Sequence, residues 1–157
     1  MHRNGLRHEI GKKHPFESTA QEAYLNLMRT YAILSADFAR LFREHGLSDA
    51  TFNTLRILRG AGTKGATCGE IGTMLNTRVP DVTRLVDRLV EEGLATRQRR
   101  RDDKRKVRVV ISSLGLCKLS TLDQPLLDLH HAQLGHMKDA DLRTLIELLE
   151  LARTPAG

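Results

Sequence analysis

Apolar residues recur at helical spacing along most of the chain. After residue 18 they follow one another at intervals of about three or four residues, as on one face of an amphipathic helix. Either Ser18 with Gln21 or Thr19 with Glu22 fits a capping box at its start. The pattern predicts a long helix that ends before Gly46, with its apolar face formed by Ala20, Tyr24, Leu27, Met28, Tyr31, Leu34, Phe38, Leu41 and Phe42.

Three shorter helices are predicted in the middle of the chain. Ser48 is a suitable N-cap for the first, and Thr67 with Glu70 forms a capping box for a short second helix through Leu75. The third runs from about residue 78 to 92, where Pro80 is tolerated because it falls in the first turn. Gly93 ends this helix. Its apolar face consists of Val82, Leu85, Val86, Leu89 and Val90.

Two strands follow the third short helix. Residues 94–99 and 106–112 both have strand character, and the second alternates Val107, Val109 and Ile111 with Lys106, Arg108 and Val110. The sequence RRDDKR at 100–105 lies between them. The pattern predicts a hairpin with a basic tip.

Leucine-rich helices are predicted at the C-terminal end. Ser113 is a candidate cap for one that continues through Leu127, although Pro125 should kink or split it. The last helix begins at Asp139, and its apolar residues cover more than half of its circumference. This surplus, with the long first helix, predicts an intertwined dimer; the residues are Leu142, Leu145, Ile146, Leu148, Leu149 and Leu151.

The order of these elements is that of a winged helix-turn-helix. We therefore expect a mainly α fold with a small two-stranded antiparallel β wing and with N- and C-terminal dimerisation helices. The expected organisation is a basic mobile arm at 1–17, a helical dimerisation region at 18–46 and 113–153, and a DNA-binding region at 47–112. A chain of 157 residues fits one compact domain.

Basic residues are concentrated in the hairpin. The net charge is +6, and eight Arg or Lys residues occur from Arg97 to Arg108. Like charges at this density repel one another unless an anion neutralises them, which favours the DNA phosphate backbone. A hairpin whose charges only keep its edge from pairing with another sheet is an open alternative. The candidate wing residues are Arg99, Arg100, Arg101, Asp103, Lys104, Arg105 and Lys106.

The third short helix is the candidate recognition helix. Its N-terminal part would enter a major groove, where arginine pairs with guanine, and Arg84 and Arg78 are the first choices. For Arg88 and Asp87, an intramolecular salt bridge that orients the helix against the hairpin is an alternative. The candidate residues are Thr77, Arg78, Val79, Pro80, Asp81, Thr83, Arg84 and Arg88.

Three stretches resemble the multiple antibiotic resistance regulator (MarR) family: LSDATFNTLRIL, GEIGTMLNTRVPDVTRLVDRLVEEGLATR, and DDKRKVRVVIS followed by LG. The resemblance covers roughly residues 20–152. It implies a homodimer with interlocked terminal helices, recognition helices in successive major grooves and wings in flanking minor grooves. It also implies that Asp103 orients Arg105 at the minor groove and that Thr83 and Arg84 form the recognition-helix pair. Arg78 departs from the family, since many members have a small capping residue there.

The function implied by the resemblance is a transcriptional regulator of double-stranded DNA. It would be a repressor that acts on a palindromic operator and is released by a small aromatic or phenolic effector. The resemblance assigns no residues of this sequence to the binding of that effector. Two alternatives stay open: a winged-helix module that binds protein or RNA, and a redox-sensing regulator. Cys68 would serve the latter because it lies at a predicted helix N-terminus, which lowers a thiol pKa.

Other classes of protein lack support in the sequence. No Ser-His-Asp order, phosphate-binding loop or dinucleotide fingerprint is visible, so we expect no enzyme and no cofactor. His130, His131 and His136 contain no pair at i and i+4 spacing, so no metal site is indicated. Neither end carries a secretory or membrane-spanning segment, so we expect a cytoplasmic protein with no membrane partner.

Overall fold

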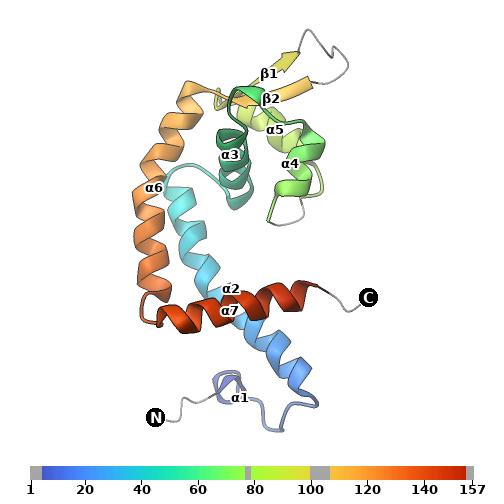
Figure 1. The fold of residues 1–157 in the computed structure, drawn as a ribbon, viewed down its shortest axis with the longest axis vertical. Helices are drawn as coiled ribbons and strands as arrows, with labels where there is room; N and C mark the ends of the chain where they lie inside the picture. The colour runs from blue at the N-terminus through green and yellow to red at the C-terminus, as the bar shows by residue number, and fades with distance from the viewer. Residues whose placement is uncertain (1–4, 77–78, 100–106, 155–157) are drawn as a thin grey trace. The chain divides into compact units, whose positions relative to one another are not determined.

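The computed structural model describes residues 5–76, 79–99 and 107–154. Its internal contacts divide the chain into two compact units, residues 1–46 and residues 47–157. Figure 1 shows the first unit from blue to cyan and the second from green to red. Among the described residues, no helix is both long enough and apolar enough to cross a membrane.

The first unit contains α1 (Leu6–Glu9) and the long helix α2 (Thr19–Glu44). Of the two predicted caps, Ser18 is the one used, because its side chain accepts a hydrogen bond from the Gln21 backbone N–H at 3.1 Å. The Gln21 side chain in turn accepts from the Glu17 backbone N–H at 2.9 Å. The prediction of a long helix that ends before Gly46 is confirmed.

The segment before α2 has a local structure that the sequence pattern did not reveal. Leu6 is buried, and the Arg7 guanidinium donates to the backbone carbonyls of Lys12 and Lys13 at 3.3 and 2.7 Å. Glu9 forms an ion pair with Arg29 of α2. A helix of four residues is little more than one turn, which is too short to show a 3.6-residue period.

The second unit opens with α3 (Asp49–Ala61), the 3-10 turn η1 (Gly62–Lys64) and α4 (Cys68–Met74). Ser48 caps α3 by a reciprocal box with Thr51, and Thr67 caps α4 by the same arrangement with Glu70. In the second box Thr67 N–H donates to Glu70 Oε2 at 2.7 Å. Both predicted helix starts are confirmed.

The next helix, α5 (Val82–Glu91), begins later than the spacing predicted. Its N-cap is Asp81, whose side chain accepts from the Arg84 backbone N–H at 2.9 Å. The prediction of a start near residue 78 with Pro80 in the first turn is therefore wrong. Two features explain the difference: Asp is a strong N-cap, and a proline disfavours helical backbone in the residue before it, which here is Val79.

The wing consists of β1 (Ala95–Arg99) and β2 (Val107–Ile111), which pair antiparallel with Ala95 opposite Ile111. Each predicted strand is confirmed to within one residue at either end. Ala66, just before α4, adds a short bridge to β2, because its backbone exchanges two hydrogen bonds with Val109, at 2.9 and 2.8 Å. The tip predicted at 100–105 lies outside the described residues.

Two long helices complete the second unit: α6 (Ser113–Leu134) and α7 (Asp139–Arg153). Ser112, not the predicted Ser113, caps α6, since its hydroxyl accepts from Gly115 N–H at 3.0 Å and donates to the Gly93 carbonyl at 2.7 Å. Pro125 lies within α6 without splitting it. A proline removes one helical hydrogen bond, and the bonded turns on either side keep this helix continuous.

The core of the second unit joins α3, α4, α5, the wing and α6. Its residues have no exposed surface. Val86 and Leu89 form the face of α5 that packs in the core, so the opposite, outer face of α5 points away from it. The mainly helical fold with a two-stranded antiparallel wing is as predicted. The core residues are Leu55, Leu58, Ile71, Val86, Leu89, Val109, Leu119 and Leu122.

Candidate nucleic-acid interface

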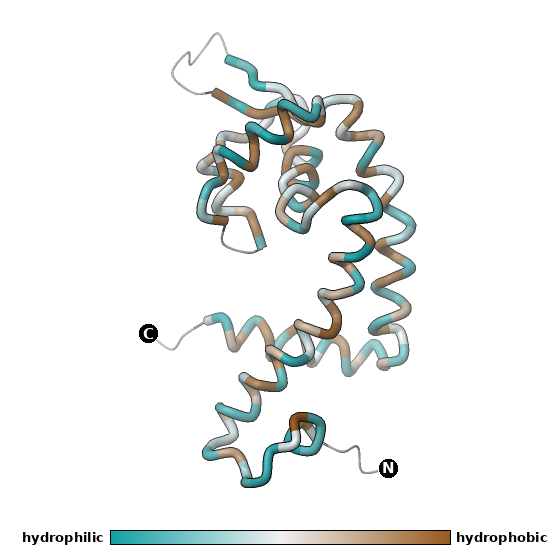
Figure 2. The backbone as a smooth tube through the Cα atoms, turned by 180° about the vertical axis from the view of Figure 1, so that it is seen from behind, coloured by the Kyte–Doolittle hydropathy of each residue, from teal (hydrophilic) through white to brown (hydrophobic). Residues whose placement is uncertain are grey.

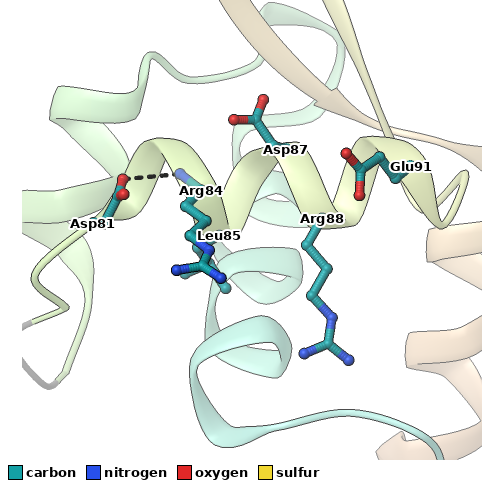
Figure 3. Close-up of a pocket in the computed structure, with 6 residues that line it drawn as sticks. All are labelled: Asp81, Arg84, Leu85, Asp87, Arg88 and Glu91. Carbon is teal, nitrogen blue, oxygen red and sulfur yellow. Dashed lines mark hydrogen bonds between the residues drawn. The ribbon is translucent and has the colours of Figure 1, made fainter.

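The outer face of α5 carries most of the predicted recognition residues that the structure describes. Asp81, Thr83, Arg84 and Arg88 are all exposed, as is Pro80 just before the helix, whereas Val79 is half-buried. Figure 3 shows Arg84 and Arg88 extending from one side of the helix and Asp87 from the opposite side. Thr77 and Arg78, the other two predicted residues, lie outside the described part of the chain.

Arg84 lies in the first turn of α5. Its backbone N–H binds the Asp81 carboxylate, which leaves the guanidinium separate from the cap. Among the described residues, the Arg84 side chain has no ion-pair partner. An exposed arginine in the first turn therefore carries its charge outward, beside a helix terminus that itself favours anions.

Asp87 and Arg88 of α5 are both paired within the molecule. Arg88 Nε donates to Glu92 Oε1 at 2.8 Å, and this hydrogen bond is the main reason why the pKa of Arg88 is raised above its usual value. Asp87 forms an ion pair with Arg97 of β1. The proposed salt bridge between α5 and the hairpin thus exists, but it joins Asp87 to Arg97, whereas Arg88 pairs along its own helix.

Some basic residues of the hairpin form ion pairs within the protein, and Arg99 is exposed to solvent. Arg97 and Arg108, the first and last of the eight basic residues and not among the candidate wing residues, are neutralised within the protein by Asp87 and Glu70. Arg99 ends β1 and is exposed. The remaining predicted wing residues lie outside the described residues: Arg100, Arg101, Asp103, Lys104, Arg105 and Lys106.

Glu70 joins the base of the wing to α4, a contact that no pattern in the sequence predicts. Its two carboxylate oxygens accept from the Arg108 guanidinium at 3.3 Å each, while Oε2 also caps α4. Arg108 donates in addition to the Gly65 carbonyl at 3.1 Å. The capping box places Glu70 and the strand alternation places Arg108, but no sequence spacing relates two residues that meet only after folding.

A side-chain bond attaches the turn before α5 to α3. Asn76 Nδ2 donates to Asn53 Oδ1 at 3.3 Å, and Asn53 is buried and donates to the Asp49 carbonyl at 3.0 Å. Because a buried amide without a partner is costly, this link stabilises one path for the chain as it leaves α4.

The cysteines and histidines form no second site within the described residues. No group of three or more His, Cys, Asp or Glu side chains in that part of the chain could hold a metal ion. Both cysteines are free thiols, with Cys68 half-buried at the start of α4 and Cys117 exposed on α6.

Known proteins share this architecture. A profile of the MarR family matches residues 45–106. The crystal structure of a MarR transcription factor from Planctomyces limnophilus is 40% identical, with a TM-score of 0.66 over 87% of this chain and 99% of that one.

Two more distant structures share the fold. Sco3205 from Streptomyces coelicolor, a MarR family transcriptional regulator in complex with DNA, has a TM-score of 0.77 at 17% identity over 90% of this chain and 91% of its own. BpsR from Bordetella bronchiseptica, whose DNA binding is regulated by 6-hydroxynicotinic acid, has a TM-score of 0.76 at 20% identity. The match covers 91% of this chain and 100% of that one. With the winged helix-turn-helix geometry and the 40% identical relative together, the chain belongs to the MarR family of DNA-binding transcriptional regulators.

Proposed function

We propose that this protein is a homodimeric repressor that binds a palindromic operator in double-stranded DNA. In this proposal the N-terminal part of α5 enters a major groove and the wing contacts the flanking minor groove. The observation that carries it is the state of Arg84, which is exposed in the first turn of α5 while the neighbouring Asp87 and Arg88 are paired within the molecule.

Base recognition would rest mainly on Arg84 and Thr83. An arginine can donate two parallel hydrogen bonds to guanine, and the methyl group of a threonine can contact the methyl group of thymine. Asp81 serves the helix as its cap, so we assign it to positioning α5 and not to a base. Arg78 is retained as a candidate base contact on its place in the sequence.

The wing would supply contacts with the DNA backbone. β1 ends at the exposed Arg99 and β2 begins at Val107, so residues 100–106 connect the two strands at the end of the hairpin farthest from α6. Five of these seven residues are basic: Arg100, Arg101, Lys104, Arg105 and Lys106. Each phosphate that they neutralise releases counterions, so their contribution weakens as the salt concentration rises.

Exposed apolar residues on α2 and α7 support the dimer. Tyr24 and Tyr31 on α2 are 62% and 57% exposed, and Leu151 on α7 is 69% exposed. In Figure 2 brown and teal alternate along both helices, as expected for faces that pack against another surface. A second copy of the chain would cover them and would place two α5 helices on half-sites about 10 base pairs apart.

Regulation by a small molecule is the final part of the proposal. The family resemblance implies a small aromatic or phenolic effector that releases the repressor, and BpsR is a protein of the same fold whose DNA binding responds to 6-hydroxynicotinic acid. Titration of an operator complex with a panel of such acids tests this part, and an unchanged complex across the panel would contradict it.

The experiment that tests DNA recognition compares Arg84→Ala with Arg143→Ala, an equal loss of charge on α7. Binding-site selection and affinity are measured for each dimer. Arg84→Ala should relax base preference at one position per half-site and cost about 1–3 kcal/mol, whereas Arg143→Ala should leave the selected sequence unchanged. An unchanged selection with Arg84→Ala would contradict the assignment, and a preference for structured RNA would favour the RNA-binding alternative.

A further inference from the structure

We propose that two ion pairs, Asp87–Arg97 and Glu70–Arg108, position the wing for DNA, and we call them the wing brace. Their four side chains would not touch DNA themselves; they would set the direction in which the hairpin projects from α4 and α5. This inference rests on the proposed function, because it concerns how the wing of a DNA-binding protein is held.

The first pair joins the recognition helix to the first wing strand. Asp87 projects from the opposite side of α5 to Arg84 and Arg88 (Figure 3), and its carboxylate meets the guanidinium of Arg97. Arg97 is paired in the sheet with Val109, a fully buried residue. The ion pair therefore connects α5 to the point where the hairpin enters the core.

The second pair joins α4 to the other strand. The Arg108 guanidinium donates to both oxygens of Glu70 and to the Gly65 carbonyl, and its side chain is only 24% exposed. Glu70 is itself oriented by its bond to the Thr67 backbone N–H. A fork-shaped donor with three acceptors on two segments can adopt few other orientations.

Together the two pairs link each strand of the hairpin to a neighbouring helix, in addition to the burial of Val109 in the core. An isolated two-stranded hairpin is marginally stable, and the additional strand contact here is the bridge between Ala66 and Val109. The last described pair of the hairpin, Arg99 with Val107, lies beyond the brace. A change of angle at the brace would be carried outward to residues 100–106, which the proposed function places against DNA.

Neutralising Asp87 or Glu70 should change the affinity for DNA in the direction opposite to that expected from charge alone. Asp87 and Glu70 are negative groups beside a DNA-binding surface, so neutralising either would strengthen binding if they acted only through repulsion of phosphates. If they position the wing, the same change weakens binding because phosphate contacts are lost. The direction of the effect therefore distinguishes the two roles.

The test uses the full-length dimer with Asp87→Asn and Glu70→Gln, since glutamine still fits the capping box of α4. The matched control is Glu91→Gln, which removes one charge from α5 at a residue with no ion pair among the described residues. Affinity for a selected operator is measured by fluorescence anisotropy between about 50 and 200 mM salt. Tm and the selected sequence are measured in parallel.

We expect each brace variant to bind about tenfold more weakly and to flatten the slope of log K against log salt by about 2 per dimer, one phosphate per wing. The selected sequence should not change, and Tm should fall by no more than about 4 °C because ion pairs that remain partly accessible to water contribute little to stability. Glu91→Gln should bind as tightly as the wild type or more tightly. A merely structural role would lower Tm and leave the salt slope as it was.

A charge exchange provides the rescue. Asp87→Arg combined with Arg97→Asp restores an ion pair of reversed polarity and should recover the wild-type salt slope, whereas Asp87→Arg alone should not. Brace variants that bind as tightly as the wild type with an unchanged slope would overturn this inference alone. A wild-type protein that binds no duplex DNA would overturn the proposed function and this inference with it.

Discussion

Two helical glycines should respond in opposite ways to the same substitution. Replacing glycine by alanine within a helix normally stabilises it by up to about 1 kcal/mol. Gly115, in the first turn of α6, and Gly60, near the end of α3, differ in what a new Cβ would meet. At Gly60 nothing lies within 4 Å, whereas at Gly115 the Cβ would overlap the Leu94 carbonyl oxygen and lie 2.8 Å from Ile111 Cγ1.

The cost at Gly115 follows from these contacts. Overpacking of this kind costs about 1–3 kcal/mol when backbone must move. The Leu94 carbonyl also accepts the Ser112 backbone N–H at 3.0 Å, so its displacement weakens a hydrogen bond worth about 0.5–1.5 kcal/mol. These losses exceed the helix gain. Gly115→Ala should therefore lower the free energy of unfolding by about 1–3 kcal/mol.

The free energy of unfolding of both variants is measured by urea titration at one fixed protein concentration, because the stability of the proposed dimer would depend on concentration. The free energy of unfolding of Gly60→Ala should equal that of the wild type or exceed it by up to about 1 kcal/mol. If Gly115→Ala were as stable as Gly60→Ala, the close approach of α6 to Leu94 and Ile111 at the base of the wing would not exist as described.

Two further substitutions test the elements that support the interface. Ser112→Ala should lower the free energy of unfolding in urea by about 1–2 kcal/mol, because it removes both the cap of α6 and the bond to the Gly93 carbonyl. Ser113→Ala should have little effect. The reverse order would show that Ser113 is the cap. Leu58→Ala should cost about 2–5 kcal/mol, because Leu58 is fully buried in α3 and the surrounding core cannot fill the cavity completely; a loss below about 1 kcal/mol would contradict its place in the core.

Local signals predicted most of the fold. Each capping box consists of residues three apart, so Thr67 with Glu70 specified the start of α4 without any knowledge of the rest of the chain. The apolar spacing predicts a start of α5 near residue 78, but Asp81 caps the helix, and Pro80 disfavours helical backbone at the residue before it. Ser112 and Ser113 are both acceptable caps in the sequence, and the Gly93 carbonyl, which binds Ser112, decides between them only after folding.

The candidate site was predictable only in part for a related reason. Helical periodicity showed that Arg84 faces away from the core, because that depends on the position of Arg84 relative to Val86 and Leu89. It could not show that Arg97 and Arg108 are neutralised, since their partners Asp87 and Glu70 reach them through tertiary contacts. Counting basic residues therefore overstated the charge available to an anion at the base of the wing.

The central claim is that two copies of α5 occupy successive major grooves of one duplex. Hydroxyl-radical footprinting of the wild-type protein on a selected operator tests it most directly. We predict two protected blocks related by the operator's symmetry, with their centres about 10 base pairs apart. A single protected block, or no protection in dilute salt, would contradict the claim.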